Sequence, residues 1–226
     1  MKLTQIIIFL LISISVKALH VDSTHSPISK LYLGISFSSV SHHIYYRTSK
    51  APEHVQSVYF APLALNLGYQ LTDKTRLQAG LAYGGNSDSY DWVNGQTETN
   101  HKQTGHAVAI PLTVQHNVLK VWRRFPIYGT ATLMPAWGIT KYETKEIVNG
   151  TTATINKGKV SGVDVFFTAG VGFNYKISNR LEGLAEYVPF RHNLTGENSI
   201  FYDWDYGLRG SLKIIKSLKV GVNYKL

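Results

Sequence analysis

The sequence predicts an all-β protein, a closed antiparallel up-and-down transmembrane β-barrel. Three observations support this prediction. Apolar residues alternate with small or polar ones through most of the chain, which is the period expected of strands with two different faces. Short connections also alternate with long ones, as in barrels with short periplasmic turns and long extracellular hairpin loops. Charged residues make up only 16% of the chain, which is low for a soluble domain.

The N-terminal residues have the pattern of a secretory signal peptide. Lys2 precedes the apolar run Ile6–Val16, and Ala18 is a small residue suited to the cleavage position. The apolar run is shorter than the ~20 residues that a membrane-spanning helix needs. We therefore expect an exported protein. The predicted organisation is a cleaved signal peptide at 1–18, a short linker at 19–28 and a barrel domain at 29–226.

Nine segments are candidate strands. Six alternate clearly: Leu31–Ser38, Leu63–Leu71, Leu77–Tyr83, Val108–Gln115, Val163–Ile177 and Trp204–Lys213. Three alternate more weakly: Phe125–Ile139, Arg180–Pro189 and Leu218–Leu226. Bacterial single-chain barrels have even strand numbers. We therefore expect eight strands, with ten as the alternative.

The connections between these segments are of two kinds. The short ones are Thr72–Thr75, Leu119–Arg124, Ile177–Arg180 and Ile214–Ser217, and the long ones are Ser39–Gln56, Gly85–Gly105, Thr140–Val160 and Phe190–Asp203. Two long connections contain Asn-Gly, at Asn94-Gly95 and Asn149-Gly150. Asn-Gly favours tight hairpins because both residues accept positive φ. The sequence therefore predicts hairpins that protrude beyond the membrane.

Aromatic residues lie near the ends of the apolar segments, where a barrel has its interfacial girdles. The predicted girdle consists of Tyr69, Tyr83, Trp122, Trp137, Tyr175, Tyr187, Trp204 and Tyr224. The opposite faces of the strands carry mainly Gly, Ala, Ser, Thr, Asn and Gln, which suit the interior of a narrow barrel. In hydrocarbon each unpaired backbone polar group costs several kcal/mol, and a closed barrel pairs all of them.

Charged residues on the predicted inner face suggest an ion-pair network that fills the lumen. They are Asp164, Lys176, Glu182, Glu186, Asp205, Arg209 and Lys213. Charges removed from water need partners, and neighbouring strands can supply them. A polar conduit or a catalytic acid pair is the alternative. Glu182 and Glu186 are four residues apart on a strand, about 13 Å at ~3.3 Å per residue. This exceeds the separation in glycosidase dyads.

No catalytic, cofactor or metal site is predicted. The chain has no cysteine, so thiolate metal sites are excluded. It also lacks His-x-x-His, His-Glu-x-x-His, Gly-x-Ser-x-Gly and phosphate-loop motifs. One enzymatic alternative stays open. His42, His43 and His106 would lie near the outer rim, where a lipid acyl hydrolase or transferase places a histidine beside a serine or an acid.

Four runs resemble the small outer-membrane β-barrel domain common in Bacteroidota, a porin-like eight-stranded barrel. They are Pro62–Gly84 (PLALNLGYQLTDKTRLQAGLAYG), Ile110–Val118, Thr168–Leu184 and the final strand Val220–Leu226. The resemblance covers most of the predicted mature chain. It implies an eight-stranded barrel in the outer membrane of a Gram-negative bacterium, with a role that the family does not specify. The last residue, Leu226, departs from the commoner terminal Phe.

The predicted function is that of a non-enzymatic outer-membrane barrel with a side-chain-plugged lumen and a structural or surface-interaction role. The alternatives are a narrow pore or small-ligand channel, a lipid A-modifying enzyme, and a soluble lipocalin-like barrel. Expected partners are outer-membrane lipid or lipopolysaccharide and the outer-membrane assembly machinery, with the barrel itself a monomer. Dispersed Lys and Arg in an exported chain argue against nucleic acid, and the sequence does not specify an extracellular ligand.

Overall fold

The computed structural model describes residues 30–47, 55, 57–95, 97–122, 125–148, 151–195 and 214–226. The predicted signal peptide, the predicted linker and the candidate strand Trp204–Lys213 lie outside these residues. Within the described part of the chain, no helix is long and apolar enough to cross a membrane.

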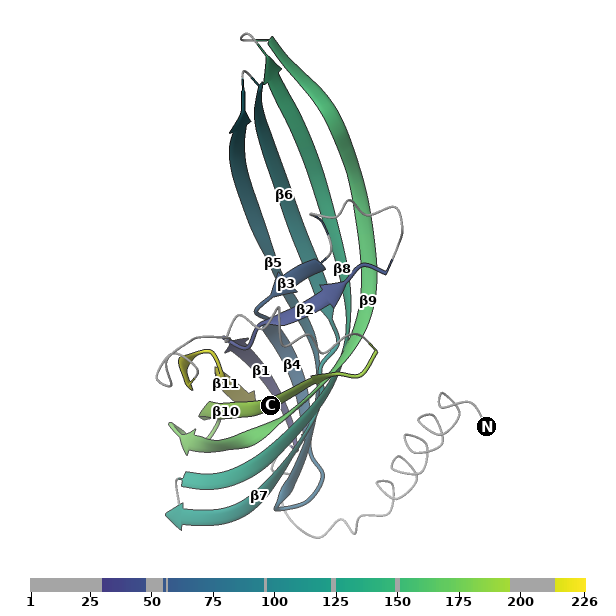
Figure 1. Cartoon of the computed structure of the whole chain (residues 1–226). Coiled ribbons are helices and arrows are strands. Elements are labelled where there is room, and N and C mark those ends of the chain that lie inside the picture. Colours follow the sequence, from purple (N-terminus) through teal and green to yellow (C-terminus); the bar gives the residue numbers. More distant parts are fainter. Residues whose placement is uncertain are drawn as a thin grey trace, which may run out of the picture.

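Antiparallel strands pair in chain order and close into a ring (Figure 1). The ring strands are β1 (Leu31–Ser38), β4 (Leu63–Gln70), β5 (Thr75–Asn94), β6 (Thr97–Ala109) with β7 (Leu112–Trp122), β8 (Phe125–Val148), β9 (Thr151–Lys176), β10 (Leu181–Asn193) and β11 (Leu218–Lys225). The first and last strands pair with each other, Ile35 opposite Val222. The prediction of a closed antiparallel barrel is therefore confirmed.

β6 and β7 are two halves of one ring strand. Their pairing with β5 continues in the same register, from Ala82 opposite Ala109 to Ala79 opposite Leu112. The interruption lies at Pro111, which has no N–H to donate. Its carbonyl still accepts a hydrogen bond of 2.9 Å from the backbone N–H of Gly80. Counting β6 and β7 as one, the described ring has eight strands, as the sequence predicted.

The two ends of the barrel differ in their connections. At one end, here the turn end, the hydroxyls of Thr72 and Ser178 accept backbone N–H hydrogen bonds that close short turns. At the other, the hairpin end, β5, β6, β8 and β9 continue far beyond the ring, as Figure 1 shows. The prediction that these strands extend as protruding hairpins is thus confirmed, and their position relative to a membrane stays a prediction. Gly95 has φ +63° at the tip of one of them, the conformation that glycine tolerates best.

One predicted connection is wrong. The sequence predicts Ile214–Ser217 as a short turn of the periplasmic kind. The structure places it before β11 at the hairpin end, where the carbonyl of Ser217 accepts from the backbone N–H of Val188 on β10. This follows from the antiparallel order. Because β11 pairs directly with β10, the chain must enter β11 at the end where β10 finishes.

Apolar side chains cover the outside of the ring, and polar side chains fill the inside. Leu65 is 64% exposed and Val171 is 55% exposed, whereas Glu186 is 2% and Asn174 1% exposed. A soluble barrel has the opposite arrangement, because the hydrophobic effect drives apolar groups away from water. The predicted orientation of the strand faces is therefore confirmed.

A short hairpin closes the lumen near the hairpin end. It consists of β2 (His42–Tyr45) and β3 (Ser57–Phe60), and we call it the plug hairpin. β3 packs against β5, β6 and β8, and β2 packs against β8 and β9. The sequence prediction of a long loop at Ser39–Gln56 missed it. The plug hairpin and the ring enclose an apolar cluster of Ile44, Tyr46, Val55, Val58, Phe60, Ala64, Ala82, Ala107, Ala109, Met134, Ala136, Tyr142, Val160 and Phe166.

Glycines on three neighbouring strands make room for the plug hairpin. A Cβ at Gly105 or Gly138 would lie within 2.4 Å of a methyl group of Val58. A Cβ at Gly162 would lie 2.7 Å from the carbonyl oxygen of Tyr45. Such separations are far below van der Waals contact, so the hairpin can dock only because these side chains are absent.

Gly138→Ala is expected to weaken docking of the plug hairpin by about 1 to 3 kcal/mol, the usual cost of overpacking a core. The stiff Val58 side chain cannot move aside easily. Gly129→Ala is the matched control, because the same strand leaves a Cβ there without neighbours within 4 Å. Limited proteolysis of the hairpin checks the prediction. Equal protection of the two variants would contradict it.

Candidate functional site

The interior near the turn end contains an ion pair that crosses the lumen. Arg76 on β5 donates two hydrogen bonds to Glu182 on β10, at 2.8 and 3.2 Å. Both side chains are buried. The Arg76 guanidinium also lies 5.7 Å from the ring centre of Tyr32, whose hydroxyl accepts a hydrogen bond from Gln78. A bidentate Arg–carboxylate pair of this kind fixes both position and orientation.

A second carboxylate, Glu186, joins strands from several sides of the barrel. One oxygen accepts hydrogen bonds from the amide of Gln115 at 2.8 Å and the hydroxyl of Tyr128 at 3.0 Å. Its other oxygen lies 3.1 Å from the ammonium of Lys219. Together with the Arg76–Glu182 pair, these contacts form what we call the lumen network. Polar groups from β5, β7, β8, β10 and β11 thus occupy the narrow interior.

Only some of the predicted lumen residues lie inside the barrel in the structure. Glu182 and Glu186 lie inside, each with its own cation, and Asp164 is buried nearer the hairpin end. Lys176 is exposed at the end of β9, although it is the register partner of Glu182. Asp205, Arg209 and Lys213 lie outside the described residues. The network as predicted from the sequence stays a prediction.

Sequence reasoning missed the cations that the structure places beside the two glutamates. Arg76 occupies a polar position between the alternating apolar residues of its strand, so the strand period assigns it to the inner face. Lys219 has the same position within β11. The predicted charges all lie in the C-terminal half of the chain, whereas ring closure places β5 opposite β10.

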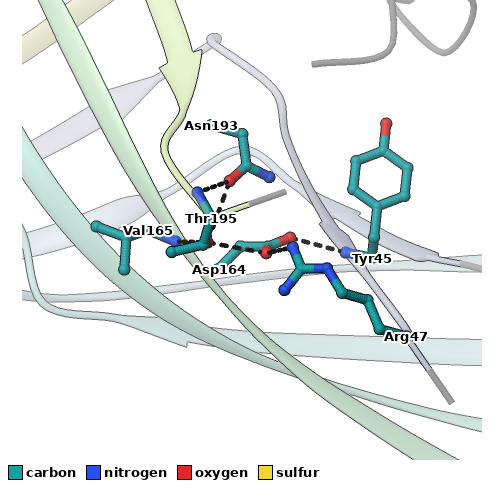
Figure 2. Close-up of polar contacts among 6 residues, drawn as sticks. All are labelled: Tyr45, Arg47, Asp164, Val165, Asn193 and Thr195. Carbon is teal, nitrogen blue, oxygen red and sulfur yellow. Dashed lines mark hydrogen bonds and ion pairs between the residues drawn. The ribbon is translucent and has the colours of Figure 1, made fainter. Parts of the chain in front are cut away.

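Asp164 links the plug hairpin to the ring (Figure 2). Its carboxylate accepts the backbone N–H of Tyr45 at 2.9 Å and pairs with the guanidinium of Arg47. The hydroxyl of Thr195 donates to the same carboxylate at 3.1 Å and accepts the backbone N–H of Val165 at 2.8 Å. The wholly buried carboxylate thus receives donors from β2, from the residues just after β2 and from the residues just after β10, so both of its oxygens have hydrogen-bond partners.

His42 of the plug hairpin is buried between aromatic rings. Its ring centre lies 4.9 Å from that of Phe166 and 5.6 Å from that of Phe60. Burial lowers the pKa of His42 to about 3, and the charges of Arg191 and His43 act in the same direction. The docked hairpin therefore holds a neutral imidazole.

Acidification is expected to weaken docking of the plug hairpin. Above pH 6.5 His42 is neutral whether the hairpin is docked or free, so its titration has no effect. As pH falls from 6.5 towards 3, only the free hairpin takes up the proton, and docking weakens by about 2 kcal/mol at pH 5. A protease active at both pH 7.5 and pH 5 measures this. His42→Leu should abolish the pH dependence, and an unchanged dependence would contradict the assignment.

Little open space separates the plug hairpin from the lumen network. The cavity between them has a volume of about 50 Å³ and is lined by Ser36, His42, Asn66, Thr130, Glu186 and Lys219 among others. That is room for a few water molecules. The described residues therefore show two successive obstructions along the lumen, one polar and one apolar.

The predicted girdle residues with described side chains face away from the lumen. Tyr83, Trp137, Tyr175, Tyr187 and Tyr224 are exposed, and Tyr69 is half-buried. The side chain of Trp122 and the whole of Trp204 lie outside the described residues. Tyr69, Tyr175 and Tyr224 lie close to the turn end of their strands. Their role as an interfacial girdle stays a prediction.

The histidines considered for an enzymatic site lie on opposite sides of the barrel wall. His42 is buried within the plug hairpin, whereas His106 is exposed on the outer face of β6. There its Nδ1 lies 2.6 Å from the hydroxyl of Tyr83. The sheet therefore keeps these two rings from acting on one substrate.

The fold and its interior define the class: an eight-stranded antiparallel up-and-down β-barrel with an apolar exterior and a plugged polar lumen. No protein-family model matches this chain, and no curated protein matches it. Similar solved structures include a major outer membrane protein from Thermus thermophilus, with 12% identity, a TM-score of 0.46, and coverage of 88% of this chain and 99% of that one.

Two further solved structures are similar to most of this chain at low sequence identity. The attachment invasion locus protein of Yersinia pestis has 11% identity and a TM-score of 0.32, covering 86% of this chain and 92% of that chain. CarO of Acinetobacter baumannii has 15% identity and a TM-score of 0.34, covering 90% of this chain and 100% of that chain.

Proposed function

We propose that this protein is an outer-membrane barrel that conducts no solutes and presents a sheet to the cell exterior as a surface-interaction module. The proposal rests on the distribution of side chains, which is the opposite of that in a soluble barrel. Leucines and valines are exposed around the ring, and charged groups are paired inside it. An apolar exterior of this kind is stable in contact with the hydrocarbon core of a membrane. A closed ring also leaves no strand edge with unpaired backbone groups in that core. A Gram-negative outer membrane is the location where such barrels assemble.

Interaction is assigned to the protruding part of β5, β6, β8 and β9. On its inner face, beyond the plug hairpin, the rings of Tyr90 and Trp92 stack with centres 5.5 Å apart. Trp92 also lines a hollow of about 450 Å³ together with Thr99, Thr144, Ile155 and Asn156. Exposed aromatic rings beside hydroxyl and amide groups combine apolar contact with hydrogen bonding. We propose that an extracellular partner binds here.

A conducting pore and a lipid-modifying enzyme receive less support. The plug hairpin and the lumen network obstruct the lumen in series, and an eight-stranded barrel leaves room inside for little besides side chains. His42 and His106 lie on opposite sides of the barrel wall and do not meet at one site. A soluble lipocalin-like barrel would bury the very side chains that are exposed here.

Membrane fractionation followed by gel electrophoresis with and without heating tests the proposal. We expect the protein in the outer-membrane fraction, with a mobility that changes only after boiling because the closed barrel resists detergent. In planar bilayers it should show no steady conductance steps. Recovery in the soluble periplasm would overturn the location, and regular channel steps would overturn the closed lumen.

A further inference from the structure

Four lysines gather on the outer face of the protruding sheet. Lys102, Lys141, Lys157 and Lys159 come from β6, β8 and β9, and we call them the lysine patch. With Thr104 and Glu143 they line one shallow hollow of about 590 Å³. This face is the continuation of the barrel's apolar exterior and lies opposite the Tyr90–Trp92 hollow.

The lysine patch begins where the apolar exterior ends. On β8 the exposed apolar residues Trp137 and Ile139 are followed on the same face by Lys141. On β9, Lys159 is separated from Val163 on that face only by Ser161. Two residues of a strand, the step from Ile139 to Lys141, span about 7 Å. Lys159 lies at the same level because it is the register partner of Lys141. The polar headgroup layer of a bilayer is about 5 to 8 Å thick on each side. In the proposed outer membrane, a hydrocarbon boundary at Ile139 would place the ammonium groups of Lys141 and Lys159 at the level of the headgroups.

The lysine patch is compensated on one side only: Glu143 is the register partner of Lys102 and of Lys157, whereas Lys141 and Lys159 have no acidic register partner. Lys141 and Lys159 are direct register partners on neighbouring strands, and like charges in that position repel each other. The one acidic residue of the hollow, Glu143, lies 3.6 Å from Lys145 and 3.8 Å from Lys157. Among the described residues, no ion pair neutralises Lys102, Lys141 or Lys159. An anion placed between them would remove the repulsion.

We propose that the lysine patch binds the phosphate groups of a lipopolysaccharide molecule whose acyl chains lie against the apolar face of β8 and β9. This inference rests on the proposed outer-membrane location and identifies a partner for one face of the protein. Charge complementarity selects an anion, and the continuity with the apolar exterior selects one that also carries hydrocarbon. Lipopolysaccharide phosphates satisfy both conditions, and a soluble phosphate satisfies only the first.

Binding of fluorescent diphosphorylated lipid A to the folded protein in phosphatidylcholine vesicles tests the proposal. We expect Lys141→Gln/Lys159→Gln to weaken binding roughly thirtyfold, about fivefold for each lysine near a charged membrane surface. The control Lys30→Gln/Lys74→Gln removes the same charge at the turn end and should bind as the unmodified protein does. Without lipid A, the patch variant should be no less stable, because it removes a repulsion.

Two comparisons make the test decisive. Dephosphorylated lipid A should bind the unmodified protein as weakly as diphosphorylated lipid A binds the patch variant. Equal binding of both lipids, or equal loss in the turn-end control, would overturn the proposal. Inorganic pyrophosphate competing at the affinity of lipid A would also overturn it. Heat-dependent gel mobility of the same vesicles shows separately whether the barrel has inserted, so failure of the proposed location is recognised independently.

Discussion

Replacing Arg76 with leucine is expected to lower the free energy of unfolding by about 3 to 5 kcal/mol, the cost of leaving a buried charge without its partner. Arg76 supplies both hydrogen bonds of the guanidinium–carboxylate pair with Glu182. Neither side chain has appreciable access to water, with exposures of 10% and 8%. Urea-induced unfolding of the protein in vesicles, followed by tryptophan fluorescence, measures the change.

The double variant Arg76→Leu/Glu182→Leu distinguishes the effect of an unpaired buried charge from the effect of lost side-chain packing. We expect it to recover much of the lost stability, because two apolar side chains of similar size leave no charge unpaired. Arg180→Leu is the control at the exposed turn end and should leave the unfolding midpoint unchanged. If Arg76→Leu and the double variant were equally unstable, the lost packing of Arg76 and not the unpaired carboxylate would be the cause.

Phe60→Ala is expected to undock the plug hairpin. Phe60 is fully buried within the cluster that joins the hairpin to the ring. Truncating a buried phenylalanine to alanine costs about 3 to 5 kcal/mol. Trypsin cleavage after Arg47 reports the undocked population. Its rate should rise about a hundredfold or more if opening is fast relative to cleavage.

Phe37→Ala makes the same chemical change on the other side of the barrel wall. Phe37 is exposed on β1 and contributes nothing to the apolar cluster that holds the plug hairpin. Its truncation should leave the cleavage rate after Arg47 unchanged. Similar rates in the two variants would show that the hairpin is held by contacts other than Phe60.

The sequence predicted the ring well because a barrel with an apolar outer face and a polar inner face imposes one simple period on its strands. Leu65 and Val171 must lie on the outer face when Asn66 and Gly170 lie on the inner face, since neighbouring residues of a strand point to opposite faces. Asn-Gly at 94–95 also predicted the protruding hairpin correctly. The sequence predicts Val108–Gln115 as one strand, and the structure shows it interrupted at Pro111 without a change of register.

The plug hairpin could not be predicted in this way, because its contacts depend on the closed ring. Ile44, Val58 and Phe60 belong to short segments whose apolar partners lie on strands far along the chain. Gly105, Gly138 and Gly162 were the available signal, three glycines that become neighbours only when the register of β6, β8 and β9 is known. Arg76 was missed for the same reason. Its partner lies across the lumen and not on an adjacent strand.

The central claim is that the apolar faces of the ring strands meet lipid and the polar faces meet the lumen. Because the chain has no cysteine, single cysteines on β9 can carry spin labels without background. Labels at Val171→Cys and Phe173→Cys should collide readily with oxygen dissolved in lipid and rarely with an aqueous nickel complex. Labels at Thr168→Cys and Asn174→Cys should be shielded from lipid oxygen. Nickel-accessible labels at 171 and 173, with oxygen-accessible ones at 168 and 174, would contradict the account.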